Sequence, residues 1–277
     1  MVVVFGVVGL LALAVLVVGN WYLWRRLFRD TTRGPGFARR AGAAGIAAGW
    51  ALAVGAVVGE RVGAPFWLQQ VLAWPGFLWL ALSIYLLLAV VAGEVVRPLL
   101  RRLLERRARA TAAVYQPHPV PAGSVPPRAP EAEPEPAPLP EPSRRLFVSR
   151  VVAGAAAAAA VGTVGYGTYG VLRGPAVKRV TVPLAKLPRA AHGYRIAVVS
   201  DIHLGPILGR GFAQKVVDTI NATQPDIVAV VGDLVDGSVK NLGPAAAPLS
   251  QLKAPSYFVT GNHEYFSGAR LGVPPGL

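Results

Sequence analysis

Four long apolar segments constrain this chain most, because each could cross a lipid bilayer, which takes about 20 apolar residues. They cover approximately residues 2–24, 41–59, 66–96 and 151–172. Hydrophobic residues make up 53% of the 277 residues and charged residues only 15%, a balance too apolar for an ordinary soluble protein. The sequence therefore predicts a multi-span α-helical membrane region.

The arginines indicate how these segments are oriented. A formal net charge of +14 is compatible with nucleic-acid binding, but the positive charge gathers in two clusters beside the apolar segments. The clusters are Arg25, Arg26, Arg29, Arg33, Arg39 and Arg40, and then Arg97, Arg101, Arg102, Arg106, Arg107 and Arg109. Cytoplasmic loops of membrane proteins have this composition. We therefore expect no nucleic-acid partner, and a multi-pass protein of the cell membrane whose C-terminal domain is extracytoplasmic.

The composition changes between the third and fourth apolar segments. Eleven of the 25 prolines fall between Pro117 and Pro142, where they alternate with glutamates. Such a stretch cannot bury a core and is typical of an extended linker. We divide the chain into a membrane region with three transmembrane helices (1–112), a Pro/Glu-rich linker (113–142), a motif with a fourth transmembrane helix (143–174) and a C-terminal domain (175–277).

The motif before the fourth segment, at residues 143–148, resembles a twin-arginine export signal. Arg144 and Arg145 are followed by Phe147 and then by a weakly apolar, Ala/Gly-rich stretch. This interpretation would make the twin-arginine export machinery a partner, with the segment retained as an anchor. The alternative is a basic stop before an ordinary membrane helix, which would place arginines at the same point.

Beyond residue 174, apolar runs alternate with an amphipathic stretch. The pattern predicts an introductory strand and turn at 177–188, a central strand at 194–200, a helix at 211–222, a strand at 226–231, a short helix at 245–252 and a third strand at 256–260. This alternation predicts a parallel α/β sheet, whose carboxyl-end edge usually carries the functional site. Polar residues follow each of the last three strands: Asp201 and His203, then Asp233, then Asn262 and His263. Carboxylates, imidazoles and an amide are suitable ligands for a divalent metal.

These residues resemble the calcineurin-like metallophosphoesterase family, especially its membrane-associated bacterial branch. The resemblance covers about residues 195–266 and rests on three blocks, Asp201–His203, Gly232–Asp236 and Gly261–Glu264. It implies two divalent metal ions (Mn, Fe or Zn), which together can hold a phosphoryl group and activate water. The resemblance implies that Asp201 and His203 bind the first metal, Asp233 bridges both, Asn262 binds the second, and His263 is catalytic beside the phosphate.

The alternative is a purely structural role, in which the Asp and Asn side chains only cap turns. Asp236 and Glu264 are expected to support the site rather than to bind metal, and Glu264 stands where the family more often has Asp.

The resemblance implies a metal-dependent phosphoester hydrolase, which the apolar segments would anchor to the membrane. The extracytoplasmic placement predicted from the arginines suggests a lipid-linked or envelope-derived phosphoester as its substrate. The family completes its second metal site with later histidines, whereas no histidine follows His263 in this sequence. We therefore expect an incomplete βαβαβ half of a two-sheet sandwich with exposed apolar sheet surface, and a fragment of little activity.

Two other classes of function stay open. One is a catalytically inactive membrane protein with a structural or interaction role. The other is a transporter-like helix bundle, although charged residues in the spans, which normally mark transport pathways, are confined to Glu60 and Glu94 near the span ends.

Overall fold

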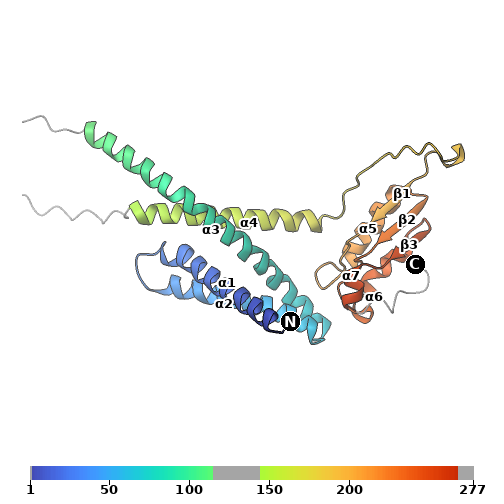
Figure 1. The fold of residues 1–277 in the computed structure, drawn as a ribbon, viewed down its shortest axis with the longest axis horizontal. Coiled ribbons are helices and arrows are strands. Elements are labelled where there is room, and N and C mark those ends of the chain that lie inside the picture. Colours follow the sequence, from blue (N-terminus) through green and yellow to red (C-terminus); the bar gives the residue numbers. More distant parts are fainter. Residues whose placement is uncertain (1, 115–143, 268–277) are drawn as a thin grey trace, which may run out of the picture. The chain divides into compact units, whose positions relative to one another are not determined.

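The computed structural model describes residues 2–114 and 144–267 (Figure 1). Its N-terminal part is helical, with α1 (Val2–Trp24), the short π-helical segment η1 (Arg25–Arg29), α2 (Phe37–Arg61), α3 (Phe66–Val114) and α4 (Arg144–Leu172). Four helical segments within this part are long and apolar enough to cross a membrane: Gly9–Arg29, Phe37–Arg61, Phe66–Arg107 and Arg145–Leu172. Each of the four predicted segments is therefore helical. Most of the predicted linker lies outside the described residues.

Two of these helices run further than the apolar segments predict. Helix α3 continues through the second arginine cluster, which the sequence assigned to a loop. Leu, Arg, Glu and Ala are strong helix formers, so this cluster extends the helix. With 49 residues, α3 is about 73 Å long, more than twice the hydrocarbon thickness of a bilayer. Helix α4 likewise begins at Arg144, so the arginine pair forms its first turn, and the export-signal interpretation stays a prediction.

The C-terminal part contains a small parallel α/β sheet, as predicted. Three strands, β1 (Ile196–Val199), β2 (Ile227–Val231) and β3 (Ser256–Val259), pair in parallel in the order β1-β2-β3. Between and after them lie α5 (Arg210–Ala222), α6 (Val239–Ala246), the 3-10 helix η3 (Ala247–Gln251) and α7 (Asn262–Ser267). All three carboxyl ends consequently open onto the same edge of the sheet.

Three details differ from the sequence prediction. The first expected strand is absent: apart from the 3-10 helix η2 (Arg189–Ala191), residues 175–193 form no regular element, and no described strand pairs with them. Strand β1, predicted to be central, is an edge strand of the described sheet, because it pairs only with β2, which is the central strand. The predicted helix at 245–252 begins earlier, as α6, and continues as η3, where Pro248 lacks the N–H that would extend an α-helix.

The two faces of the sheet differ in burial. Val228 and Val230 of β2 are buried in one core with the apolar face of α5, which includes Val216 and Val217. On the other face, four apolar side chains, Ile196, Val198, Tyr257 and Val259, are 60–69% exposed. Parallel sheets are usually covered on both faces. Among the described residues there is one sheet, so the expected exposed apolar surface is present.

Candidate metal centre

The loops that follow β1 and β2 are joined beyond the ends of the strands. The amide of His203 donates to the carbonyl of Asp233 (2.9 Å), and that of Leu204 donates to Leu234 (2.8 Å). In return the Asp236 amide donates to the Leu204 carbonyl at 2.8 Å. These bonds extend the parallel pairing into the loops and fix the positions of the side chains they carry.

The backbone at this edge is strained. Asp201, His203 and Asp233 have φ values of 55°, 50° and 51°, in the left-handed region. Only one other non-glycine residue in the described ranges, Gln224, has a positive φ. Such a conformation costs roughly 1–2 kcal/mol per residue, although Asp and His tolerate it better than most. Strain of this kind concentrates at functional sites, where the surrounding structure holds it in place.

Two glycines allow the second and third loops to touch. A Cβ atom placed on Gly232 would lie 2.9 Å from the Cα of Gly261, and one on Gly261 would lie 2.6 Å from the Asp233 nitrogen. Neither position has room for a side chain. The close approach brings Asp233 next to the start of α7, and the amide of His263 donates to Asp233 Oδ1 at 2.9 Å.

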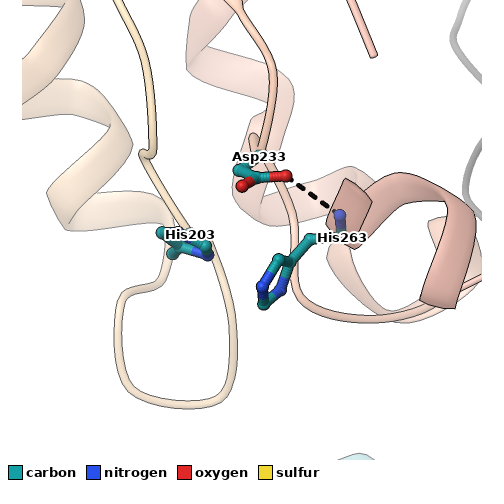
Figure 2. A group of neighbouring side chains, drawn as sticks. All are labelled: His203, Asp233 and His263. Atoms are coloured by element: carbon teal, nitrogen blue, oxygen red, sulfur yellow. Dashed lines mark hydrogen bonds between the residues drawn. The ribbon is translucent and has the colours of Figure 1, made fainter. Parts of the chain in front are cut away.

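Three side chains, two from the loops after β1 and β2 and one from the first turn of α7, form a group that could hold a metal ion. Figure 2 shows His203, Asp233 and His263, each of which offers one ligand atom, and these atoms lie within 4.8 Å of one another. The two imidazole rings meet edge to face, with centroids 4.6 Å apart. Two imidazoles and a carboxylate are a suitable donor set for Zn, Fe or Mn.

The remaining predicted ligands lie nearby but contribute less to this group. Asp201 is 65% exposed, and its Oδ1 lies 3.7 Å from Nε2 of His203. Asn262 is the first residue of α7; it is exposed, and its side chain makes no hydrogen bond to the described residues. His263, predicted as catalytic, lies among the candidate ligands. The individual roles of all five residues stay predictions.

Asp236 connects the two histidines. Its Oδ1 lies 2.9 Å from Nδ1 of His203 and 2.7 Å from Nδ1 of His263. The hydrogen bond to Asp236 is the main reason why the pKa of His203 is raised, and it outweighs the opposing effect of burial. A carboxylate that accepts a hydrogen bond from Nδ1 orients the ring and directs Nε2 at the metal position. Asp236 therefore has the supporting role that the sequence suggested.

Glu264, which the sequence also predicted to support the site, does so by holding two loops together. Its side chain is only 1% exposed, and its two oxygens accept four backbone hydrogen bonds. The donors are Leu234 (2.6 Å), Val235 (3.2 Å), Asp233 (3.0 Å) and Gly261 (2.7 Å). Burial alone would raise the pKa of Glu264, but these donors lower it overall, so the carboxylate stays charged.

A sequence signal for this role existed. Gly261 directly precedes α7 and Glu264 is its third residue, which is the spacing of a capping box, in which the glutamate accepts from the backbone of the capping residue. The signal was missed because α7 itself was not predicted.

Comparisons with known proteins agree with this arrangement. Residues 194–275 match the calcineurin-like phosphoesterase family. Over 104 residues the chain is 45% identical to a zebrafish (Danio rerio) protein named transmembrane protein with metallophosphoesterase domain, covering 37% of this chain and 24% of that protein. It is 34% identical over 104 residues to an uncharacterized metallophosphoesterase of Helicobacter pylori, covering 37% of this chain and 27% of the relative.

The chain spans about a quarter of the length of these two curated relatives. No solved structure matches it. The transmembrane relative and the four apolar helices together indicate a membrane protein.

We predict that Glu264→Gln loosens the loop at 232–236. Without the charged acceptor, the buried N–H groups of the loop are poorly satisfied. This lowers the free energy of local opening by about 2 kcal/mol, which reduces hydrogen-exchange protection of the loop amides roughly 30-fold. Exchange measured by mass spectrometry on the full chain checks this, with the exposed Asp218→Asn on α5 as a control that changes nothing there. Equal protection in wild type and Glu264→Gln would contradict the role of Glu264.

The stabilisation that the Glu264 carboxylate provides depends on pH. Because the pKa of Glu264 is lowered on folding, its stabilisation is fully present above the ordinary value of 4.5 and is lost as the pH falls through the lowered value. The difference between wild type and Glu264→Gln is therefore expected to shrink on acidification below 4.5.

Proposed function

We propose that this chain, whose residues 194–275 belong to a calcineurin-like phosphoesterase domain, is a membrane-anchored hydrolase that cleaves phosphoesters with the help of divalent metal. The observation that carries the proposal is the grouping of His203, Asp233 and His263 at the carboxyl edge of a parallel sheet. Metal-assisted hydrolysis needs no side-chain nucleophile. This suits a site built of acids, amides and imidazoles.

We assign metal binding to Asp201, His203, Asp233 and Asn262, with Asp233 shared between two ions. Three features support the assignment. The donor atoms are those that Mn, Fe and Zn accept, the backbone of three of the four residues is held in a strained conformation, and Asp236 orients the histidines. When bound, the ions would polarise the phosphoryl oxygens and lower the pKa of a bound water.

Asp233 and His263 have different roles in the proposed mechanism. Asp233 accepts a hydrogen bond from the His263 amide through Oδ1, which leaves its other oxygen to be shared by the two ions. His263 is 41% exposed, so an incoming phosphoester can reach it, and its Nδ1 is held by Asp236. We propose that His263 stabilises the charge on the phosphate or protonates the leaving oxygen. General-acid catalysis of this kind typically raises the reaction rate about 10²–10⁴-fold.

The anchor constrains the substrate. A catalytic domain joined to apolar helices works beside a bilayer, so we propose a phosphoester that is lipid-linked or derived from the cell envelope. The arginine clusters, which cytoplasmic loops normally carry, further support four spans with the domain outside the cytoplasm.

For the chemistry, we predict low, manganese-dependent turnover of a generic aryl phosphoester by the detergent-solubilised chain. Asp233→Ala should lower this turnover more than about 100-fold. Mutation of residues that only support metal ligands already lowers metal affinity or activity about 10–100-fold, and Asp233 is a proposed ligand itself. Asp218→Asn should leave it unchanged. Turnover that survives a chelator or Asp233→Ala would contradict the proposal. So would an absence of both turnover and manganese-dependent stabilisation, the result expected of an inactive structural protein.

For the orientation, we predict that a reporter fused after Gly174 is active only outside the cytoplasm. Alkaline phosphatase fused there is expected to be active, and the same enzyme fused after Arg109 is expected to be inactive. An inactive fusion after Gly174 together with an active one after Arg109 would contradict the proposed topology.

A further inference from the structure

A second candidate site lies in the part of the structure formed by the described residues 2–48, 82–114 and 144–162. A pocket of about 560 Å³ is lined there by five arginines: Arg26, Arg97, Arg101, Arg102 and Arg145. They come from η1, α3 and α4. Two glutamates, Glu94 and Glu105, also line it, so positive charge is in excess.

Two acids, Glu94 in the pocket lining and Asp30 nearby, accept hydrogen bonds from Arg26 but not from Arg97, and the Nε of both arginines has no partner among the described residues. Arg26 donates to Asp30 at 2.9 Å and to Glu94 at 2.7 Å. Arg97 is only 5% exposed, yet its nearest carboxylate oxygens are 3.5 and 3.8 Å away, and its Nε has no hydrogen-bond partner among the described residues. A buried guanidinium with unused donors is costly, so the pocket has capacity for a further anion.

The outer arginines have no partner among residues 2–114 and 144–267. In the described ranges, the side chains of Arg101, Arg102 and Arg145 make no hydrogen bond or ion pair. Guanidinium groups bind phosphate oxygens in pairs of parallel hydrogen bonds, which suits several arginines around one tetrahedral anion. The geometry points to a binding site for the phosphate group of an anionic membrane lipid.

The surroundings favour a lipid over a soluble phosphate. A smaller adjoining cavity of about 180 Å³ shares Arg101, Glu105 and Arg145 with the pocket and adds two apolar side chains, Leu104 and Val148. Charged and apolar linings thus lie side by side, as the head and glycerol region of a lipid require. Basic pockets between helices at the membrane boundary are suited to such head groups. The site also gives Arg145 a role that does not depend on export.

The test is native mass spectrometry of the full chain in phosphatidylcholine nanodiscs that contain a few mole per cent of dioleoyl phosphatidic acid. We expect one phosphatidic acid molecule to be retained per chain. The double variant Arg101→Gln/Arg145→Gln should weaken retention roughly thirtyfold, at about fivefold per arginine. The matched control Arg106→Gln/Arg109→Gln also removes two positive charges, but from positions of α3 outside the pocket. It should change lipid retention less than twofold.

Other outcomes would overturn the proposal. An equal loss in both double variants would mean general electrostatic attraction, and no loss in the pocket variant would exclude the site. Displacement of the lipid by an equal concentration of soluble glycerol 3-phosphate would assign the pocket to free phosphates. If the double variant loses its helical circular dichroism, the single exposed change Arg102→Gln decides, with about fivefold weaker retention expected and unchanged retention excluding the site.

Discussion

The buried carboxylate of Glu264 is the interaction on which the candidate metal centre depends. A charge in this position would be strongly unfavourable without partners, and four backbone N–H groups provide them. Three of those groups belong to the loop after β2 and one to the loop after β3. The residue therefore joins the two loops, and the glycines at 232 and 261 let them approach closely enough for one carboxylate to reach both.

The rest of the site follows from that junction. The left-handed backbone of Asp201, His203 and Asp233 would relax in an isolated loop, but the pairing between the first two loops and the Glu264 junction prevents it. Asp236 then aligns both imidazoles through a single oxygen. A site whose ligands are held before the metal arrives has the properties of a preorganised centre.

The sequence predicted the strands and the residues that follow them because buried parallel strands are continuous apolar runs and their ends are marked by polar residues. It failed where a neighbour decides the structure. The valines at 177, 180 and 182 have the composition of a strand but no described partner, and the position of β1 at the edge depends on pairing that no local pattern records. Arg26, Arg97 and Arg145 are far apart in the sequence, so only the packing of their helices could reveal the shared pocket.

The central claim is that the side chains at this edge converge on a divalent cation, and pulsed electron paramagnetic resonance of Mn²⁺ bound to the full chain tests it most directly. The account predicts nitrogen couplings from coordinated imidazole that weaken in His203→Ala and persist in His192→Ala, since His192 is an exposed residue outside the group. A spectrum of fully hydrated manganese, or nitrogen couplings unaffected by His203→Ala, would contradict it.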